Sequence, residues 1–119
     1  MKVRNFTNHE INFLLPGGRR VTLPPDPEGP ARVVITREQV GTVEVNGATV
    51  PVFAPALGGV HGLPDPEPGT YYVVSRIVAM ALAGKRHDLL VPDQVVKDGE
   101  GRPLGSTALA VPRKEAWPA

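Results

Sequence analysis

The sequence predicts a small α+β domain that is mostly β, an open barrel or sandwich of short antiparallel strands with one short helix at about residues 76–83. Prolines (14) and glycines (13) recur throughout the 119 residues and separate short apolar runs. Most of these runs are rich in β-branched residues or alternate apolar with polar residues, as strands do. The run 76–83 differs: it is rich in Ala, Leu and Met, with apolar residues at helical spacing.

The first 23 residues predict a strand followed by a hairpin. Residues 2–6 are expected to be extended, and Thr7-Asn8-His9 to form a turn or bulge, since Thr and Asn side chains bond readily to nearby backbone. Residues 10–15 and 19–23 flank the turn signal Pro16-Gly17-Gly18 and are expected to pair.

A proline-rich segment, residues 24–30, lacks most of its amide donors and is expected to be a stiff surface loop. Residues 31–36 are strongly β-branched and predict a buried strand. Residues 37–39 are expected to form a connection.

Asn46-Gly47, between the apolar runs 40–45 and 48–53, is the clearest hairpin signal, because both residues tolerate the positive φ of a type I′ turn. Residues 54–69 are rich in glycine and proline and predict a long irregular loop. Its part from Gly58 to Gly69 is a candidate lid.

A strand–helix–strand unit is expected near the C-terminus. Residues 70–74 predict a strand, Ser75 a helix N-cap and 89–91 a second strand. The two strands pair either parallel, through a right-handed crossover, or antiparallel. A last hairpin is expected over residues 94–97 and 103–110. We expect one domain over residues 1–111 and a C-terminal tail over 112–119.

Composition excludes several function classes. The chain has no cysteine, which excludes disulfides, thiolate metal sites and cysteine nucleophiles, and favours the cytoplasm. The N-terminus lacks the apolar core of a signal peptide, and no run approaches the roughly 20 residues of a membrane span. A net charge of +1 argues against nucleic acid as the partner. Scattered histidines argue against a metal site, and no cofactor is expected.

Five residues are candidate ligand contacts. Asn5, Thr7 and His9 share one face if the segment is extended, and could bind a phosphate, a ribose or a base. Ser75 and Arg76 stand where a strand enters a helix, a position that suits an anion. The alternative interpretation is structural: a turn satisfied by its own side chains, and an ordinary N-cap followed by a surface arginine.

Two other histidines are weaker candidates. His61 stands among glycines and could approach a ligand, or be a plain loop residue. His87-Asp88 could form a general base with its orienting carboxylate, although a histidine is also expected at a helix end. Ser106 lacks the flanking glycine pattern of a hydrolase nucleophile.

Several segments resemble a family of small proteins of unassigned activity from bacterial and phage genomes. The family pattern Asn-x-Thr-Pro-His-x-Ile-Asn is similar to residues 5–12, with Asn8 in place of the usual proline. Its segment Gly-Thr-x-Tyr-x-Val-Ser-x-x-Val-Ala is similar to residues 69–79. Further similarity lies at Leu23-Pro24-Pro25, at Ala31-Arg32-Val33, at Gly62-Leu63-Pro64, and in residues 88–93 and 98–105. The resemblance implies a compact accessory protein, often of phage origin, that acts by binding.

We therefore expect a non-enzymatic protein that captures a small phosphorylated, nucleotide-like host signal and so counters host defence. Two alternatives stay open. One is an inhibitor that binds a host protein, such as a nuclease or RNA polymerase. The other is a small enzyme with His9 or His87 as general base. Sequestering proteins often form sites between subunits, so we also expect a homo-oligomer.

Overall fold

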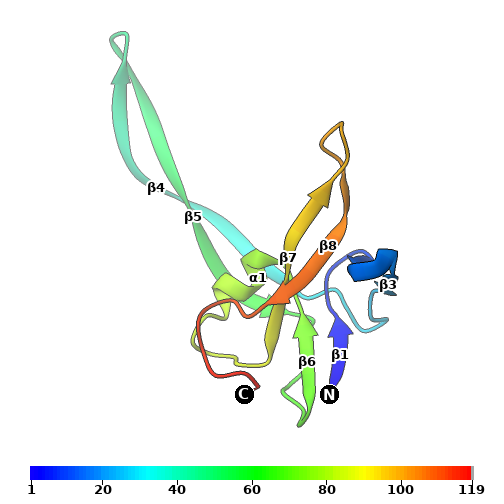
Figure 1. Cartoon of the computed structure of the whole chain (residues 1–119). Coiled ribbons are helices and arrows are strands. Elements are labelled where there is room, and N and C mark those ends of the chain that lie inside the picture. The colour runs from blue at the N-terminus through cyan, green and yellow to red at the C-terminus, as the bar shows by residue number, and fades with distance from the viewer. Residues whose placement is uncertain (119) are drawn as a thin grey trace.

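The structure is a computed structural model of the chain, and it describes residues 1–118. Within them it is mostly β with one short helix, which confirms the predicted fold class (Figure 1). The elements are β1 (Lys2–Asn5), β2 (Ile11–Leu14), the 3₁₀ turn η1 (Pro16–Gly18), β3 (Arg20–Leu23), β4 (Arg32–Val45), β5 (Ala48–His61), β6 (Thr70–Val73), α1 (Arg76–Ala81), β7 (Leu89–Lys97) and β8 (Pro103–Ala110).

The domain is built on a six-stranded sheet in the order β1-β6-β7-β8-β2-β3. The predicted hairpins β2–β3 and β7–β8 are present and antiparallel. The strand–helix–strand unit pairs parallel, with Tyr72 opposite Leu89 and Val73 opposite Leu90. β1 also runs parallel to β6. The sheet is therefore mixed rather than purely antiparallel, because a helical crossover returns the chain in the same direction.

The two ends of this sheet approach each other. Just after β3, Pro25 forms an isolated parallel bridge with Asn5 at the end of β1. The amide of Asp26 donates to the carbonyl of Asn5 over 2.8 Å. This closure agrees with the expected open barrel.

The core lies on both faces of β6 and β7. Tyr72 and Val74 face one side, where Phe6 packs edge to face on Tyr72 with ring centroids 5.4 Å apart. Tyr71 and Val73 face the other side. A central strand covered on both faces needs apolar residues at every position, which explains the continuous run Tyr71-Tyr72-Val73-Val74.

Strand β7 continues where the sequence predicts a break. The second strand of the unit was expected to cover residues 89–91 only, but β7 runs through Pro92 to Lys97. β6 pairs with β7 at Leu89 and Leu90, and from Val91 onward β7 pairs with β8. One side of β7 is thus a free edge at Pro92, where a missing amide donor costs nothing.

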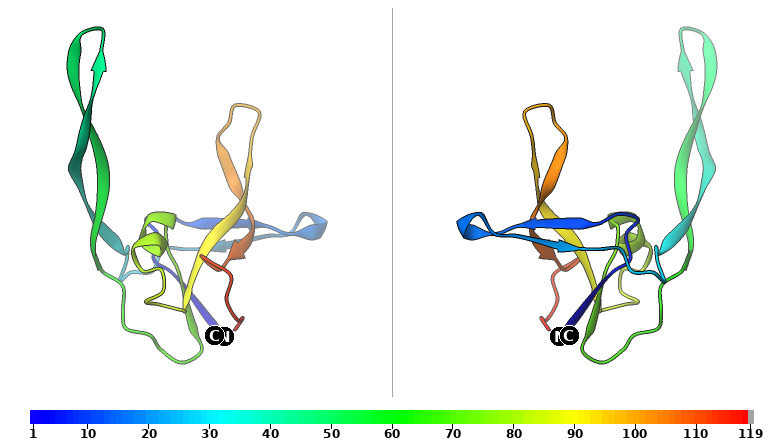
Figure 2. Two further views of the ribbon diagram at one scale, coloured as in Figure 1. Left: turned by 90° about the vertical axis from the view of Figure 1, so that its left-hand side faces the viewer. Right: turned by 90° about the vertical axis from the view of Figure 1, so that its right-hand side faces the viewer.

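A long hairpin, which we call the arm, stands out from the domain (Figures 1 and 2). It consists of β4 and β5, which pair only with each other. Its tip is the predicted Asn46-Gly47 turn, with φ of 49° and 83°. The radius of gyration is 17.9 Å, against about 13.5 Å for a compact domain of this length.

Three sequence predictions in this region are wrong. The strand expected to be buried at 31–36 is buried only at Ala31 and half-buried at Val33, and it is exposed from Val34 onward because it enters the arm. The expected connection 37–39 lies inside β4, and residues 54–61 of the expected loop belong to β5. Gly58 was expected to interrupt the strand, but it lies at a β-bulge within β5. A Cβ atom at this position would lie 3.2 Å from the Val34 carbonyl oxygen.

The predicted tail packs on the domain over the residues that are described. Trp117 lies on Tyr71 with ring centroids 4.4 Å apart. His87 Nδ1 lies 2.8 Å from Glu115 Oε2. The last residue of the predicted tail, Ala119, lies outside the described residues.

Candidate functional site

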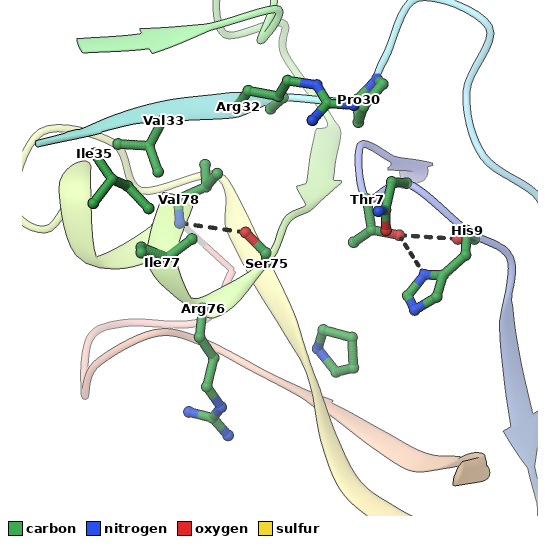
Figure 3. Close-up of a pocket in the computed structure, with 13 residues that line it drawn as sticks. Thr7, His9, Pro30, Arg32, Val33, Ile35, Ser75, Arg76, Ile77 and Val78 are labelled. Carbon is green, nitrogen blue, oxygen red and sulfur yellow. Dashed lines mark hydrogen bonds between the residues drawn. The ribbon is translucent and has the colours of Figure 1, made fainter. Parts of the chain in front are cut away.

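A pocket of about 440 Å³ lies where the arm meets the domain (Figure 3). Three separate segments form it: the turn after β1, the base of β4 and the start of α1. They contribute, with Pro92 of β7, the lining residues Thr7, Asn8, His9, Pro30, Ala31, Arg32, Val33, Ile35, Ser75, Arg76, Ile77 and Val78. The sheet topology brings these distant segments together.

Asn5 holds the turn side of the pocket in shape. Asn5 is 1% exposed, and its side-chain amide group donates to the carbonyls of His9 (3.0 Å) and Leu23 (3.1 Å). Its carbonyl oxygen accepts from the Thr7 amide (2.9 Å) and lies 2.6 Å from the Thr7 hydroxyl. Asn5 thus has all its hydrogen-bonding capacity occupied and lies beneath the pocket.

The start of α1 forms the opposite side. Ser75 caps the helix, since its hydroxyl oxygen accepts from the Val78 amide over 3.4 Å (Figure 3). The helix has only six residues, so its own dipole is small. The positive charge on this side therefore comes mainly from the exposed side chain of Arg76.

Charge in the pocket is positive and unbalanced. Arg32 and Arg76 line it, His9 adds an imidazole, and none of its lining residues is acidic. Across residues 1–118, neither arginine has an acidic partner.

Arg4 and Arg86, two arginines near the core, are each paired with a carboxylate. Arg4 Nε lies 2.8 Å from Asp26 Oδ2, and this bond holds the pKa of the Asp26 carboxyl below its ordinary value. Arg86 is similarly paired with Asp88, at 2.8 Å. Arg32 and Arg76 differ from these two, as do Arg19, Arg20, Arg37 and Arg113, which also lack an acidic partner within residues 1–118; what distinguishes Arg32 and Arg76 is that both line one pocket.

The structure brings together four of the five predicted contacts. Thr7, His9, Ser75 and Arg76 line one pocket, whereas Asn5 supports it from below. Arg32 was not predicted as a contact. The residues next to Arg32 in the sequence indicate only an exposed arginine. No local pattern indicates that it lines a pocket.

Other sequence candidates are arranged differently. His87 does not pair with Asp88, because Asp88 binds Arg86 and His87 contacts Glu115 instead. His61 lies in β5 opposite Arg32 and is not part of the lining. No residue of the expected lid, 58–69, lines the pocket. The first part of that segment belongs to β5 rather than to a loop.

Neither a metal site nor a membrane-crossing helix is found in the part of the chain that the structure describes. No group of three or more His, Asp or Glu side chains there could hold an ion. No helix within those residues has the length and apolar character to cross a membrane. A second pocket of similar volume, about 450 Å³, adjoins the first and shares His9 and Pro92 with it; its lining includes Glu10.

No family model, no curated protein and no solved structure matches this chain.

Proposed function

We propose that this protein binds and sequesters a small phosphorylated, nucleotide-like molecule in the pocket at the base of the arm. The observation that carries the proposal is that Arg32 and Arg76, neither of which has an acidic partner among the described residues, line one pocket that has no acidic lining residue. Unpaired guanidinium groups favour a ligand that brings its own negative charge.

The rest of the lining suits the organic part of such a ligand. Val33, Ile35 and Ile77 supply apolar walls against which a base or sugar can pack. His9 can stack on a base or donate a hydrogen bond. The volume of about 440 Å³ is within the usual range of about 300–1,000 Å³ for small-molecule sites.

Capture without chemistry is favoured over catalysis. Among the described residues, no carboxylate is hydrogen-bonded to the His9 ring, whose side-chain neighbour is the Thr7 hydroxyl. His87 does contact Glu115, but its side chain is 55% exposed and lies outside this pocket. The alternative of a host-protein inhibitor expected an exposed apolar or charged patch and no concave pocket; the structure has a pocket and also exposes large apolar side chains on the arm.

The biological part of the proposal rests on the family resemblance alone. That resemblance, in segments 5–12 and 69–79, is an expectation from the sequence that no family model or curated protein tests. A protein of this kind that captures a host nucleotide signal would counter a host defence.

Isothermal titration against a panel of mononucleotides, cyclic nucleotides and dinucleotides, with the matching nucleosides, tests the proposal. We expect binding of a phosphorylated member and none of its nucleoside. Arg32→Ala and Arg76→Ala should each weaken binding by about 10-fold or more, the usual effect of losing a charge-assisted hydrogen bond.

Arg19→Ala is the matched control, because Arg19 is exposed, is unpaired among the described residues and lies in the turn between β2 and β3. It should leave the affinity unchanged. Absence of binding for every phosphorylated compound, or equal losses in all three variants, would refute the proposal.

A further inference from the structure

The second pocket lies in the angle between the hairpins β2–β3 and β7–β8, which point in different directions from the domain (Figure 2). It is lined by residues 9–12, by Pro92 and Val95 of β7, and by residues 103–106. His9 and Pro92 also line the pocket at the base of the arm, which we call the first pocket. Because the two pockets meet at these residues, a ligand held in the first can extend past His9 into the second.

Both pockets open on the same face of the sheet. Ala110 of β8 packs against the core cluster that contains Val78 of α1. Residues two or four apart along a strand point to the same side, so Ser106 faces that side too. Ile11 of β2 packs in the cluster on the other face, so its neighbour Asn12 is directed toward the second pocket. One extended ligand can therefore occupy both pockets without crossing the sheet.

Ser106 offers the second pocket a hydroxyl group that has no partner. The residue is only 4% exposed, and its side chain makes no hydrogen bond within residues 1–118. No described polar side-chain atom is both sealed from solvent and without a hydrogen bond, so this hydroxyl reaches the pocket that Ser106 lines. It is available to a ligand as a donor or as an acceptor.

The second pocket is negative where the first is positive. Glu10 lines it, and the carboxylate of Glu10 has no basic partner within residues 1–118. An ionised carboxylate only accepts hydrogen bonds, and it repels a phosphate group. We therefore expect the phosphate of a ligand beside Arg32 and Arg76, and a group that donates hydrogen bonds beside Glu10.

A nucleobase with an exocyclic amino group fits these requirements. Its flat faces can pack on Val95 and Leu104, apolar lining residues that are 51% and 44% exposed. Its amino group can donate to Glu10, and its ring nitrogen can accept from Ser106. A purely apolar group would leave both of these polar side chains unpaired. The volume of about 450 Å³, close to that of the first pocket, gives a second nucleoside as much room as the first.

We propose that the ligand is a dinucleotide that spans both pockets. Its phosphate lies on Arg32 and Arg76 in the first pocket, and an amino-bearing base of its second nucleoside lies on Glu10 and Ser106 in the second pocket. This inference rests on the proposed function, because it requires phosphate binding in the first pocket, and it adds the class of the ligand.

Isothermal titration with linear dinucleotides of adenosine, guanosine and inosine, and with the mononucleotides of adenosine and guanosine, tests this inference. The adenosine or guanosine dinucleotide should bind at least about 10-fold tighter than its mononucleotide. The inosine dinucleotide lacks the amino group and should lose that gain. Glu10→Ala and Ser106→Ala should each weaken binding of the dinucleotide by about 10-fold and leave binding of the mononucleotide unchanged.

Glu38→Ala is the matched control, because Glu38 is an exposed carboxylate on the arm with no partner among the described residues. It should bind both ligands like wild type. A mononucleotide that binds as tightly as the dinucleotides would overturn this inference and leave the proposed function standing. The same holds for an inosine dinucleotide that binds as tightly as the others, or for variants that lose affinity for both ligands equally. If no phosphorylated compound binds, both the inference and the proposed function are wrong.

Discussion

Asn5 fixes the turn that carries Thr7 and His9 into the pocket, so its replacement tests how that side of the site is built. Asn5→Ala removes two donors, to the carbonyls of His9 and Leu23, and one oxygen on which the Thr7 amide and hydroxyl converge. Four hydrogen bonds at about 1 kcal/mol each give an expected loss of about 4 kcal/mol, within a range of about 2–6 kcal/mol. That is a large part of the total free energy of unfolding of a small domain.

Urea unfolding followed by far-ultraviolet circular dichroism measures the loss. Asn8→Ala is the matched control: Asn8 is an exposed neighbour of the same residue type, with no hydrogen bond of its own side chain among the described residues. It should change the free energy of unfolding by less than about 0.5 kcal/mol. If Asn5→Ala cost less than about 1 kcal/mol, or if both variants cost the same, the turn would not depend on Asn5.

Two further predictions concern the domain beneath the site. Gly105→Ala should lower the unfolding midpoint clearly, because its methyl group would lie 2.5 Å from the Asn12 carbonyl oxygen, whereas Gly99→Ala has open space and should be nearly neutral; equal effects would contradict this. Asp26→Asn should destabilise at neutral pH, since Arg4 depresses the Asp26 pKa when folded. The stabilisation by the ionised Asp26 carboxylate is fully present above its pKa in the unfolded chain, about 3.9, and is lost as the pH falls through its lower pKa in the folded protein. The plots of unfolding free energy against pH for wild type and Asp26→Asn should therefore converge below about pH 4. Curves that stayed parallel would contradict it.

Local chemistry was enough to predict much of the fold. The Asn46-Gly47 turn, the turn at Pro16-Gly17-Gly18 and the Ser75 cap each depend on a few adjacent residues, and all three are present. The strand–helix–strand unit was also recognisable, because its change from β-branched to helix-favouring residues is abrupt.

The arm was not predictable for a physical reason. A β-branched run such as 31–36 has the same pattern whether it faces its own core or stands free of it. Burial was therefore assigned to residues that the structure exposes, including Ile35 at 51%. Gly58 and Gly59 were interpreted as loop residues, whereas they lie inside β5 at a β-bulge opposite Val34.

The site was predictable only in part. Thr7 and Ser75 were recognisable from their local chemistry, but Arg32 reaches the pocket through the path of the chain from β3 to β4. No spacing in the sequence relates Arg32 to Arg76. The convergence of both arginines is a property of the topology.

The most direct test of the proposed ligand site is an amide chemical-shift titration with the nucleotide that binds best in the panel. Saturable shifts should gather at Thr7, Arg32, Ser75 and Arg76, and the amides of the η1 turn should not move. A titration without saturable shifts, or with shifts centred away from the base of the arm, would contradict the account.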